Sequence, residues 1–244
     1  MDPATLNTKI YADGADLDGL LALAAQPHIT GFTTNPTLMR KAGISDYATF
    51  AKQVLEHITD RPISFEVFSD DADGMRAQAK EIASWGPNVY VKIPVTNTRR
   101  EPMTELVREL STSGVQVNVT ALMTLRQVTE ITGALADGAP SNISVFAGRI
   151  ADTGRDPVPL MRDALAVMAD APQAELIWAS PREVLNIIQS HEIGCHIITV
   201  THDLLGKLHL LGKNLGQYSL DTVRMFHDDA AAAGYSLESA GVGR

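Results

Sequence analysis

The side chain with the clearest chemical potential is a lysine inside an apolar, strand-like run. Lys92 lies within residues 89–95, VYVKIPV. Strand alternation places it on the face opposite its aliphatic neighbours. If those neighbours pack against helices, Lys92 points into the interior, where burial of an ammonium ion is costly and the neutral, nucleophilic amine is favoured. The alternative is a solubilising lysine on an edge strand.

Two acidic residues also interrupt or end strand-like runs. Glu66 shares a strand face with Ser64 and Phe68. A carboxylate there needs a partner or a proton, so it either pairs with a cation across the interior or relays protons through water. Asp13 ends the run Lys9–Asp13, where it could act as a base or cap the following turn.

Several polar residues follow other strand-like runs and carry a structural as well as a chemical interpretation. Asn35 precedes Pro36 and is typical of a helix N-cap. The segment 180–183, SPRE, has the pattern of a capping box, with Ser180 as the cap. Arg182 would then oppose the dipole of that helix, which indicates an anion between them. Together with Arg149, it could clamp a phosphate.

Short strand-like segments alternate with helix-like segments along the chain, and the residues discussed above lie in or just after the strand-like ones. The segments rich in β-branched residues predict eight strands, at Lys9–Asp13, Ile29–Thr33, Ile63–Phe68, Val89–Ile93, Val115–Val119, Ile143–Ala147, Glu175–Ala179 and His196–Val200. Helical periodicity lies between them, for example at Tyr47–Ile58, Met75–Ser84, Met103–Ser111 and Leu160–Ala169.

Eight strand–helix units favour closure into a single (β/α)8 TIM barrel, an α/β fold, over an open sheet. No G-x-G-x-x-G follows the first strand, so the dinucleotide-binding alternative lacks its signature. The barrel is expected to occupy residues 1–218, with the helix of the eighth unit at His202–Lys213. Ser219–Gly234 predicts an extra C-terminal helix within a helical arm, residues 219–236, and residues 237–244 predict a flexible tail.

Composition and charge narrow the classes of partner. The 244 residues carry a formal net charge of -9, which disfavours nucleic acid and anionic membranes. No signal peptide or membrane span is recognisable, and the single cysteine, Cys195, cannot form an intramolecular disulfide, so a cytoplasmic location is expected. The histidines show neither His-x-His nor His-Glu-x-x-His, and we expect no catalytic metal.

Taken in order along the chain, these segments resemble the transaldolase family, in its short bacterial form. The resemblance covers nearly the whole chain. The segments that carry it are Asp13, Thr33-Thr34-Asn35-Pro36, Ser64-Phe65-Glu66-Val67, Val91-Lys92-Ile93-Pro94, Val117-Asn118-Val119-Thr120, Phe146-Ala147-Gly148-Arg149-Ile150 and Ala179-Ser180.

The resemblance implies a role for each of these positions. Lys92 would form the Schiff base, Asp13 would be the general acid/base, and Glu66 with Thr120 would hold a catalytic water. Substrate-binding roles are implied for Thr33, Asn35, Asn118, Ser144, Phe146, Arg149, Ser180 and Arg182. The last two and Arg149 match the phosphate-binding positions, although Pro181 replaces the family's usual aromatic residue between them.

The resemblance implies a transaldolase that moves a dihydroxyacetone unit between sugar phosphates, without a cofactor. Related aldolases have glutamine and tyrosine where this chain has Glu66 and Phe146. The alternatives are an aldolase that releases free dihydroxyacetone, a non-catalytic sugar-phosphate-binding barrel, and an isomerase or epimerase that only transfers protons. Short members of the family often form rings, so a homo-oligomer, such as a pentamer or decamer, is expected with the terminal helix as the arm.

Overall fold

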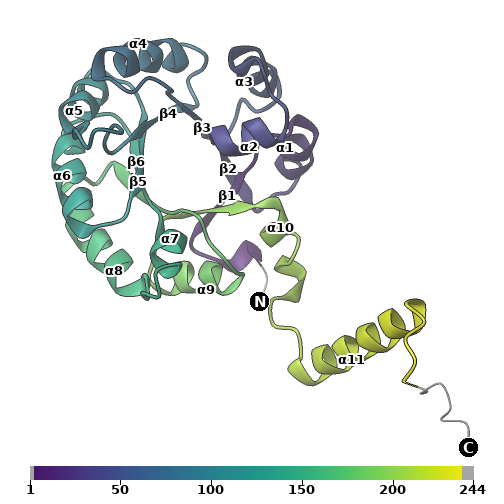
Figure 1. Ribbon diagram of the computed structural model, residues 1–244. Helices are drawn as coiled ribbons and strands as arrows, with labels where there is room; N and C mark the ends of the chain where they lie inside the picture. Colours follow the sequence, from purple (N-terminus) through teal and green to yellow (C-terminus); the bar gives the residue numbers. More distant parts are fainter. Residues whose placement is uncertain (1–2, 238–244) are drawn as a thin grey trace, which may run out of the picture. The chain divides into compact units, whose positions relative to one another are not determined.

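The computed structural model describes residues 3–237, and the chain divides into two compact units, residues 2–208 and residues 209–244. The first unit is a closed barrel of parallel strands joined in sequence order, with the last strand pairing with the first (Figure 1). The eight strands are β1 (Lys9–Asp13), β2 (Ile29–Thr33), β3 (Ile63–Glu66), β4 (Val89–Pro94), β5 (Val117–Leu122), β6 (Ser141–Val145), β7 (Ala174–Trp178) and β8 (Ile197–Thr201).

Helices surround the barrel as an outer ring (Figure 1). They are α1 (Leu17–Ala24), α2 (Pro36–Lys41), α3 (Tyr47–His57), α4 (Ala72–Ala83), α5 (Thr104–Thr112), α6 (Leu125–Leu135), α7 (Ala147–Ala151), α8 (Val158–Val167), α9 (Leu185–Glu192) and α10 (His202–Leu205). Short 3-10 turns lie at Pro3–Thr5, Met168–Asp170 and Leu208–Leu210. The predicted (β/α)8 barrel is therefore confirmed, as is an additional C-terminal helix, α11 (Leu215–Ala232).

Part of the barrel's core is a cluster of buried side chains on or next to the neighbouring strands β7, β8 and β1. Tyr11, Ile177, Ala179 and Ile197 form a buried cluster. Gly31 lies opposite Tyr11 in the β1–β2 ladder, and a Cβ atom at Gly31 would lie 2.5 Å from the tyrosine ring. The absence of a side chain at this position therefore leaves room for the Tyr11 ring.

Some predicted boundaries in the barrel are wrong. β3 ends at Glu66, and Phe68 lies beyond it with 52% of its surface exposed. β5 begins later than predicted and continues to Leu122. The expected helix His202–Lys213 is instead α10 followed by the short turn Leu208–Leu210.

In the second unit, α11 begins four residues before the predicted cap. Asn214 is the N-cap, and its side chain accepts a hydrogen bond from the backbone nitrogen of Gln217 at 3.0 Å. Ser219 therefore lies inside the helix. The C-terminal end was predicted more closely, because Gly234 adopts a left-handed conformation just after the helix. Except for residue 237, the predicted tail lies outside the described residues.

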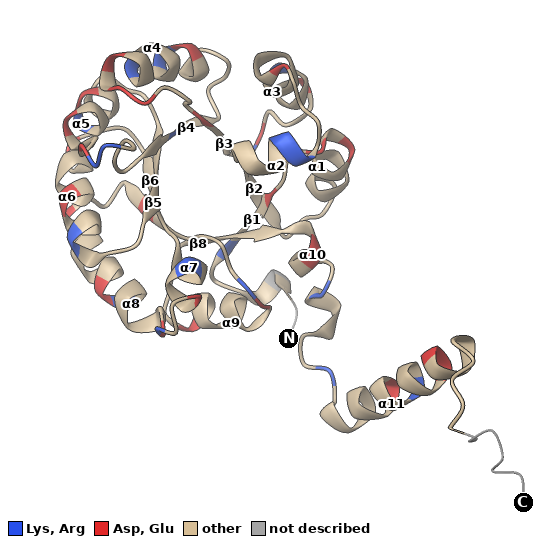
Figure 2. Cartoon of the chain, in the orientation of Figure 1, with Lys and Arg blue, Asp and Glu red and all other residues tan. Residues whose placement is uncertain are grey.

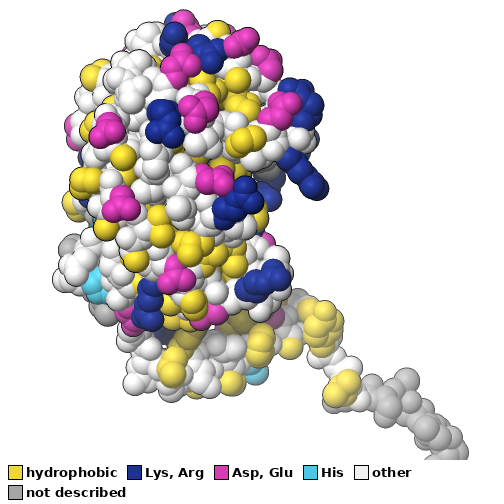
Figure 3. All heavy atoms as spheres, turned by 90° about the vertical axis from the view of Figure 1, so that its left-hand side faces the viewer, with side chains coloured by type: hydrophobic (Ala, Val, Ile, Leu, Met, Phe, Trp, Pro, Cys, Tyr) yellow, Lys and Arg dark blue, Asp and Glu magenta, His cyan; other side chains and the backbone are white. Residues whose placement is uncertain are grey.

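Charged residues lie mainly on the outer helices and loops, whereas the strands carry few of them (Figure 2). On the face seen in Figure 3, lysine and arginine side chains are interspersed with aspartate and glutamate rather than gathered in one area. Ion pairs such as Arg76–Glu109 and Arg126–Glu130 join residues of opposite charge on the helices. Within residues 3–237, no helix has the length and apolar character to span a bilayer.

Candidate active site

The strands contain five charged residues, and these separate into two groups. Lys9 and Glu175 lie near the beginning of their strands and pair with each other at 2.8 Å, partly exposed. The other three, Asp13, Glu66 and Lys92, lie at or near the carboxyl ends of β1, β3 and β4. The catalytic sites of such barrels form at that end.

Lys92 is buried inside the barrel, with 6% of its surface exposed. Its Nζ donates a hydrogen bond to the carbonyl oxygen of Thr34 at 2.8 Å and lies 3.3 Å from Oε2 of Glu66. Lys92 and Glu66 are also direct partners in the β3–β4 ladder. The edge-strand alternative for Lys92 is therefore wrong. Glu66 does have a cationic partner, but this partner lies on the neighbouring strand rather than across the interior.

Asp13 is held at the end of β1 by two neighbours from the β2 end. Its carboxylate accepts hydrogen bonds from the hydroxyl of Thr33 at 2.8 Å and from Nδ2 of Asn35 at 3.2 Å. Burial raises the pKa of Asp13, while the nearby Lys92 charge and these two hydrogen bonds lower it. Asn35 is also the N-cap of α2, as predicted, because its Oδ1 accepts from the backbone nitrogen of Leu38.

A chain of neutral polar groups lies on neighbouring strands. Asn118 is the ladder partner of Lys92; its Nδ2 donates to the hydroxyl of Ser64 at 3.0 Å, and its Oδ1 accepts from the hydroxyl of Ser144 at 2.7 Å. These bonds fix the amide orientation. Thr120, two residues further along β5, is buried, and its hydroxyl has no hydrogen-bond partner among the described residues.

A second group of predicted residues surrounds α7, which directly follows β6. Arg149 is exposed on this helix, and its guanidinium lies 5.4 Å from the ring centre of the half-buried Phe146. A Cβ atom at Gly148 would lie 1.5 Å from the backbone oxygen of Ser180 and 3.3 Å from Nε of Arg182. The structure therefore brings Ser180 and Arg182 against the helix that carries Arg149.

The predicted capping box at Ser180 is wrong. Ser180 has a φ of 61°, and α9 begins only at Leu185, so Arg182 lies before the helix rather than in its first turn. Asn186, inside α9, instead accepts hydrogen bonds from the backbone nitrogens of Arg182 and Glu183. The Arg182 side chain makes a bidentate ion pair with Asp152, whose pKa is lowered by that bond.

Three contributors to this arrangement were not predicted as site residues. Ser64 lies on the same strand face as Glu66, a sequence signal that could have identified it. Thr199 donates to the Thr33 hydroxyl at 2.5 Å, since the single proton of Thr33 goes to Asp13. Tyr47 bonds to the main chain of Glu66, and nothing in the sequence indicated that contact.

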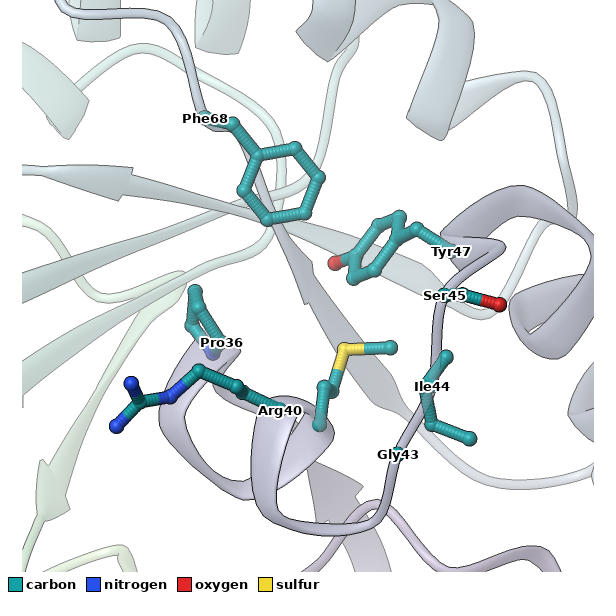
Figure 4. A pocket seen from close by; sticks show the side chains of 8 residues that line it. Pro36, Arg40, Gly43, Ile44, Ser45, Tyr47 and Phe68 are labelled. Carbon is teal, nitrogen blue, oxygen red and sulfur yellow. The ribbon is translucent and has the colours of Figure 1, made fainter.

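A surface cavity of about 370 Å³ lies between α2, the segment after it and the end of β3 (Figure 4). Its lining includes Met39, Arg40, Ile44, Tyr47 and Phe68. None of the three charged strand residues lines it. The cavity is therefore separate from the lysine and its carboxylate neighbours.

Comparison with known proteins identifies the family. The family model described as transaldolase/fructose-6-phosphate aldolase matches residues 10–240. A "probable transaldolase" of Dehalococcoides mccartyi is 34% identical over 198 residues, which is 81% of this chain and 88% of that protein. One from Streptococcus equi subsp. zooepidemicus is 35% identical over 202 residues, covering 82% and 89%.

Solved structures are similar in fold alone. A putative phosphonomutase from Burkholderia cenocepacia aligns with a TM-score of 0.57 at 14% identity, over 86% of this chain and 94% of that one. A putative deoxyribose-phosphate aldolase from Coccidioides immitis aligns with a TM-score of 0.54 at 10% identity, over 80% and 81%. With its barrel, its buried lysine and its sequence relatives, the chain belongs to the transaldolase/fructose-6-phosphate aldolase family.

Proposed function

We propose that this protein is a transaldolase that transfers a dihydroxyacetone unit from a ketose phosphate to an aldose phosphate through a Schiff base on Lys92. The observation that carries the proposal is the burial of the Lys92 amine within 3.3 Å of the Glu66 carboxylate at the carboxyl end of the barrel. Fructose 6-phosphate and sedoheptulose 7-phosphate are the donors we would test first.

In the first step, the neutral amine of Lys92 attacks the C2 carbonyl of the ketose. The carbonyl oxygen leaves as water, which takes one proton from the amine and one from an acid, and a protonated imine remains. Glu66 is the nearest carboxylate to the amine and would exchange these protons through a water molecule. The buried Thr120 hydroxyl, which has no partner among the described residues, would bind the same water.

In the second step, Asp13 takes the proton of the C4 hydroxyl. The C3–C4 bond breaks, its electron pair moves toward the imine to give an enamine, and an aldose phosphate leaves. The enamine then attacks the aldehyde carbon of an acceptor, Asp13 returns a proton to the new hydroxyl, and water hydrolyses the imine. The hydrogen bonds from Thr33 and Asn35 to Asp13 support this role because they orient its carboxylate.

The neutral groups support binding of the three-carbon fragment. Asn118 lies beside Lys92 in the β4–β5 ladder, and Ser144 donates a hydrogen bond to its amide oxygen. The amide and hydroxyl groups of these two residues match the polar groups of a dihydroxyacetone unit. The phosphate would bind near Arg149, Ser180 and Arg182, which adjoin one another through Gly148. Arg182 would bind it with the N–H groups that its pair with Asp152 leaves available.

Borohydride trapping tests the covalent step. Reduction in the presence of fructose 6-phosphate or dihydroxyacetone should attach the three-carbon fragment to Lys92, located by mass spectrometry of peptides. Lys92→Met should remove the adduct, whereas Lys80→Met, which changes an exposed lysine on α4, should leave it unchanged. An adduct at a different lysine, or none during turnover, would refute the scheme.

The aldolase alternative predicts release of free dihydroxyacetone. It is separated from a transaldolase by measuring dihydroxyacetone with and without an acceptor aldehyde. A transaldolase needs the acceptor for turnover, because the enamine is otherwise retained on Lys92.

We also propose that α11 mediates self-association. Its large apolar side chains include Leu215, Val223, Met225 and Phe226, which are between 50% and 80% exposed. A surface of this kind is more stable when covered.

A further inference from the structure

The main-chain groups of Glu66 extend past the strand ladder on one side. β2 pairs with β3 only as far as Thr33 opposite Ser64, after which the β2 chain turns into α2. On the other side the ladder continues, because the backbone nitrogen of Val67 donates to the carbonyl oxygen of Lys92 at 3.2 Å. The nitrogen and oxygen of Glu66 therefore need partners from elsewhere.

The hydroxyl of Tyr47 supplies both partners. It accepts a hydrogen bond from the Glu66 nitrogen at 2.6 Å and donates one to the Glu66 oxygen at 3.2 Å. A phenol has one proton and free lone pairs, so both bonds can form at once. In this way a side chain from α3 takes the place that a longer β2 would occupy.

Tyr47 is itself held firmly. It is the first residue of α3, whose N-cap Asp46 accepts from the backbone nitrogen of Thr49 at 3.0 Å. Its ring makes an edge contact with Phe68 at 4.5 Å between centres and lies near Phe65 and Trp85 (Figure 4 shows the Phe68 contact). Burial raises the pKa of the Tyr47 hydroxyl, so it keeps the proton that it donates to Glu66.

We propose that Tyr47 is a positioning residue for Glu66, and through it for proton transfer at Lys92. The Glu66 carboxylate lies 3.3 Å from Nζ of Lys92, so a shift of the Glu66 main chain changes this distance directly. The β4 ladder fixes one side of the β3 end, and the Tyr47 hydroxyl fixes the other. The inference rests on the proposed function, because it assumes that Glu66 takes part in the reaction.

Tyr47→Phe tests the inference with the smallest change available, since it removes only the hydroxyl. We expect kcat for dihydroxyacetone transfer to fall about 10- to 100-fold, as misplacement of a catalytic group by about 1 Å costs up to the larger figure. KM for the ketose should change much less. Tyr47 lies on α3, which follows β2, whereas the proposed phosphate residues Arg149, Ser180 and Arg182 follow β6 and β7. The kcat values are divided by the fraction of folded protein, measured by circular dichroism, so unfolded molecules are not counted. Tyr218→Phe, on α11, is the matched control and should retain wild-type kcat.

A double-mutant cycle with Glu66→Ala separates positioning from general destabilisation. If Tyr47 acts through Glu66, adding Tyr47→Phe to Glu66→Ala should cause no further loss of kcat. Losses that multiply, or a Tyr47→Phe protein with wild-type kcat, would overturn the inference. Wild-type activity of Glu66→Ala itself would instead count against the role of Glu66 in the proposed function, and the two failures are therefore distinguishable.

Discussion

Gly148→Ala should damage the proposed phosphate site while leaving Lys92 and its neighbours Asp13 and Glu66 intact. The new Cβ would lie 1.5 Å from the backbone oxygen of Ser180, whereas ordinary contact begins at 3.4 Å, so the two segments must separate by about 1.9 Å. Ser180 already has a φ of 61°, which leaves its backbone little freedom to adapt. The loop that carries Arg182 would move with it.

The magnitude follows from the hydrogen bonds at risk. A hydrogen bond to a charged group contributes about 1.5–3 kcal/mol, so losing one to the phosphate lowers kcat/KM about 10- to 150-fold. The assay compares kcat/KM for fructose 6-phosphate with the rate of borohydride trapping by dihydroxyacetone, which has no phosphate. We expect the first to fall and the second to change little.

Gly133→Ala provides the control, because Gly133 lies within α6 and a Cβ atom there meets nothing within 4 Å. It should gain about 0.5–1 kcal/mol of stability from the better helix former, with unchanged activity. Two results would refute the reasoning: a Gly148→Ala enzyme with unchanged kcat/KM for the phosphorylated donor, or an equal loss with phosphorylated and unphosphorylated substrates.

Three further predictions concern stability and assembly. Burial raises the pKa of Asp13 in the folded protein above its value in the unfolded chain. Above the folded-state pKa, the ionised carboxylate therefore lowers the free energy of unfolding. This loss disappears as the pH falls below the unfolded-state pKa. Asp13→Asn should therefore abolish transfer yet raise Tm at neutral pH, with the difference shrinking toward acid pH; a lower Tm at neutral pH would contradict this. Gly31→Ala should cost about 1–3 kcal/mol in urea unfolding, because its Cβ overlaps the Tyr11 ring, and wild-type stability would refute the overlap. Val223→Glu on α11 should reduce the solution mass measured by sedimentation, and an unchanged mass would exclude Val223 from the proposed interface.

The sequence predicted those features whose cause is local. Short segments rich in β-branched residues identified all eight strands, because such runs bounded by turns need no distant information. Strand alternation then singled out Lys92 and Glu66 as charges on an otherwise neutral strand face. The cap at Asn35 was also predictable, since an asparagine before a proline at the first helical position serves the helix by itself.

Features decided by distant contacts were not predictable in this way. The SPRE segment has a complete capping pattern, yet the close approach of Gly148 and a left-handed Ser180 give that loop another path. The side chain of Asn186, within the helix, accepts the hydrogen bonds of the backbone nitrogens of Arg182 and Glu183 instead. The Tyr47 contact joins residues 19 positions apart, so neither strand nor helix periodicity could indicate it.

The electrostatics of the site allow one carboxylate to act as both base and acid in the proposed mechanism. Burial raises the pKa of Asp13 and the positive charge of Lys92 lowers it, so the two side chains are coupled. When Lys92 is neutral and attacks the ketone, that lowering influence is absent. Formation of the protonated imine restores a positive charge at the same nitrogen. Asp13 then passes its proton through water to Glu66, which has given one to the departing water, and becomes the ionised base that C3–C4 cleavage requires. The enamine left by cleavage is neutral again, which favours protonated Asp13, the acid needed when the acceptor aldehyde arrives.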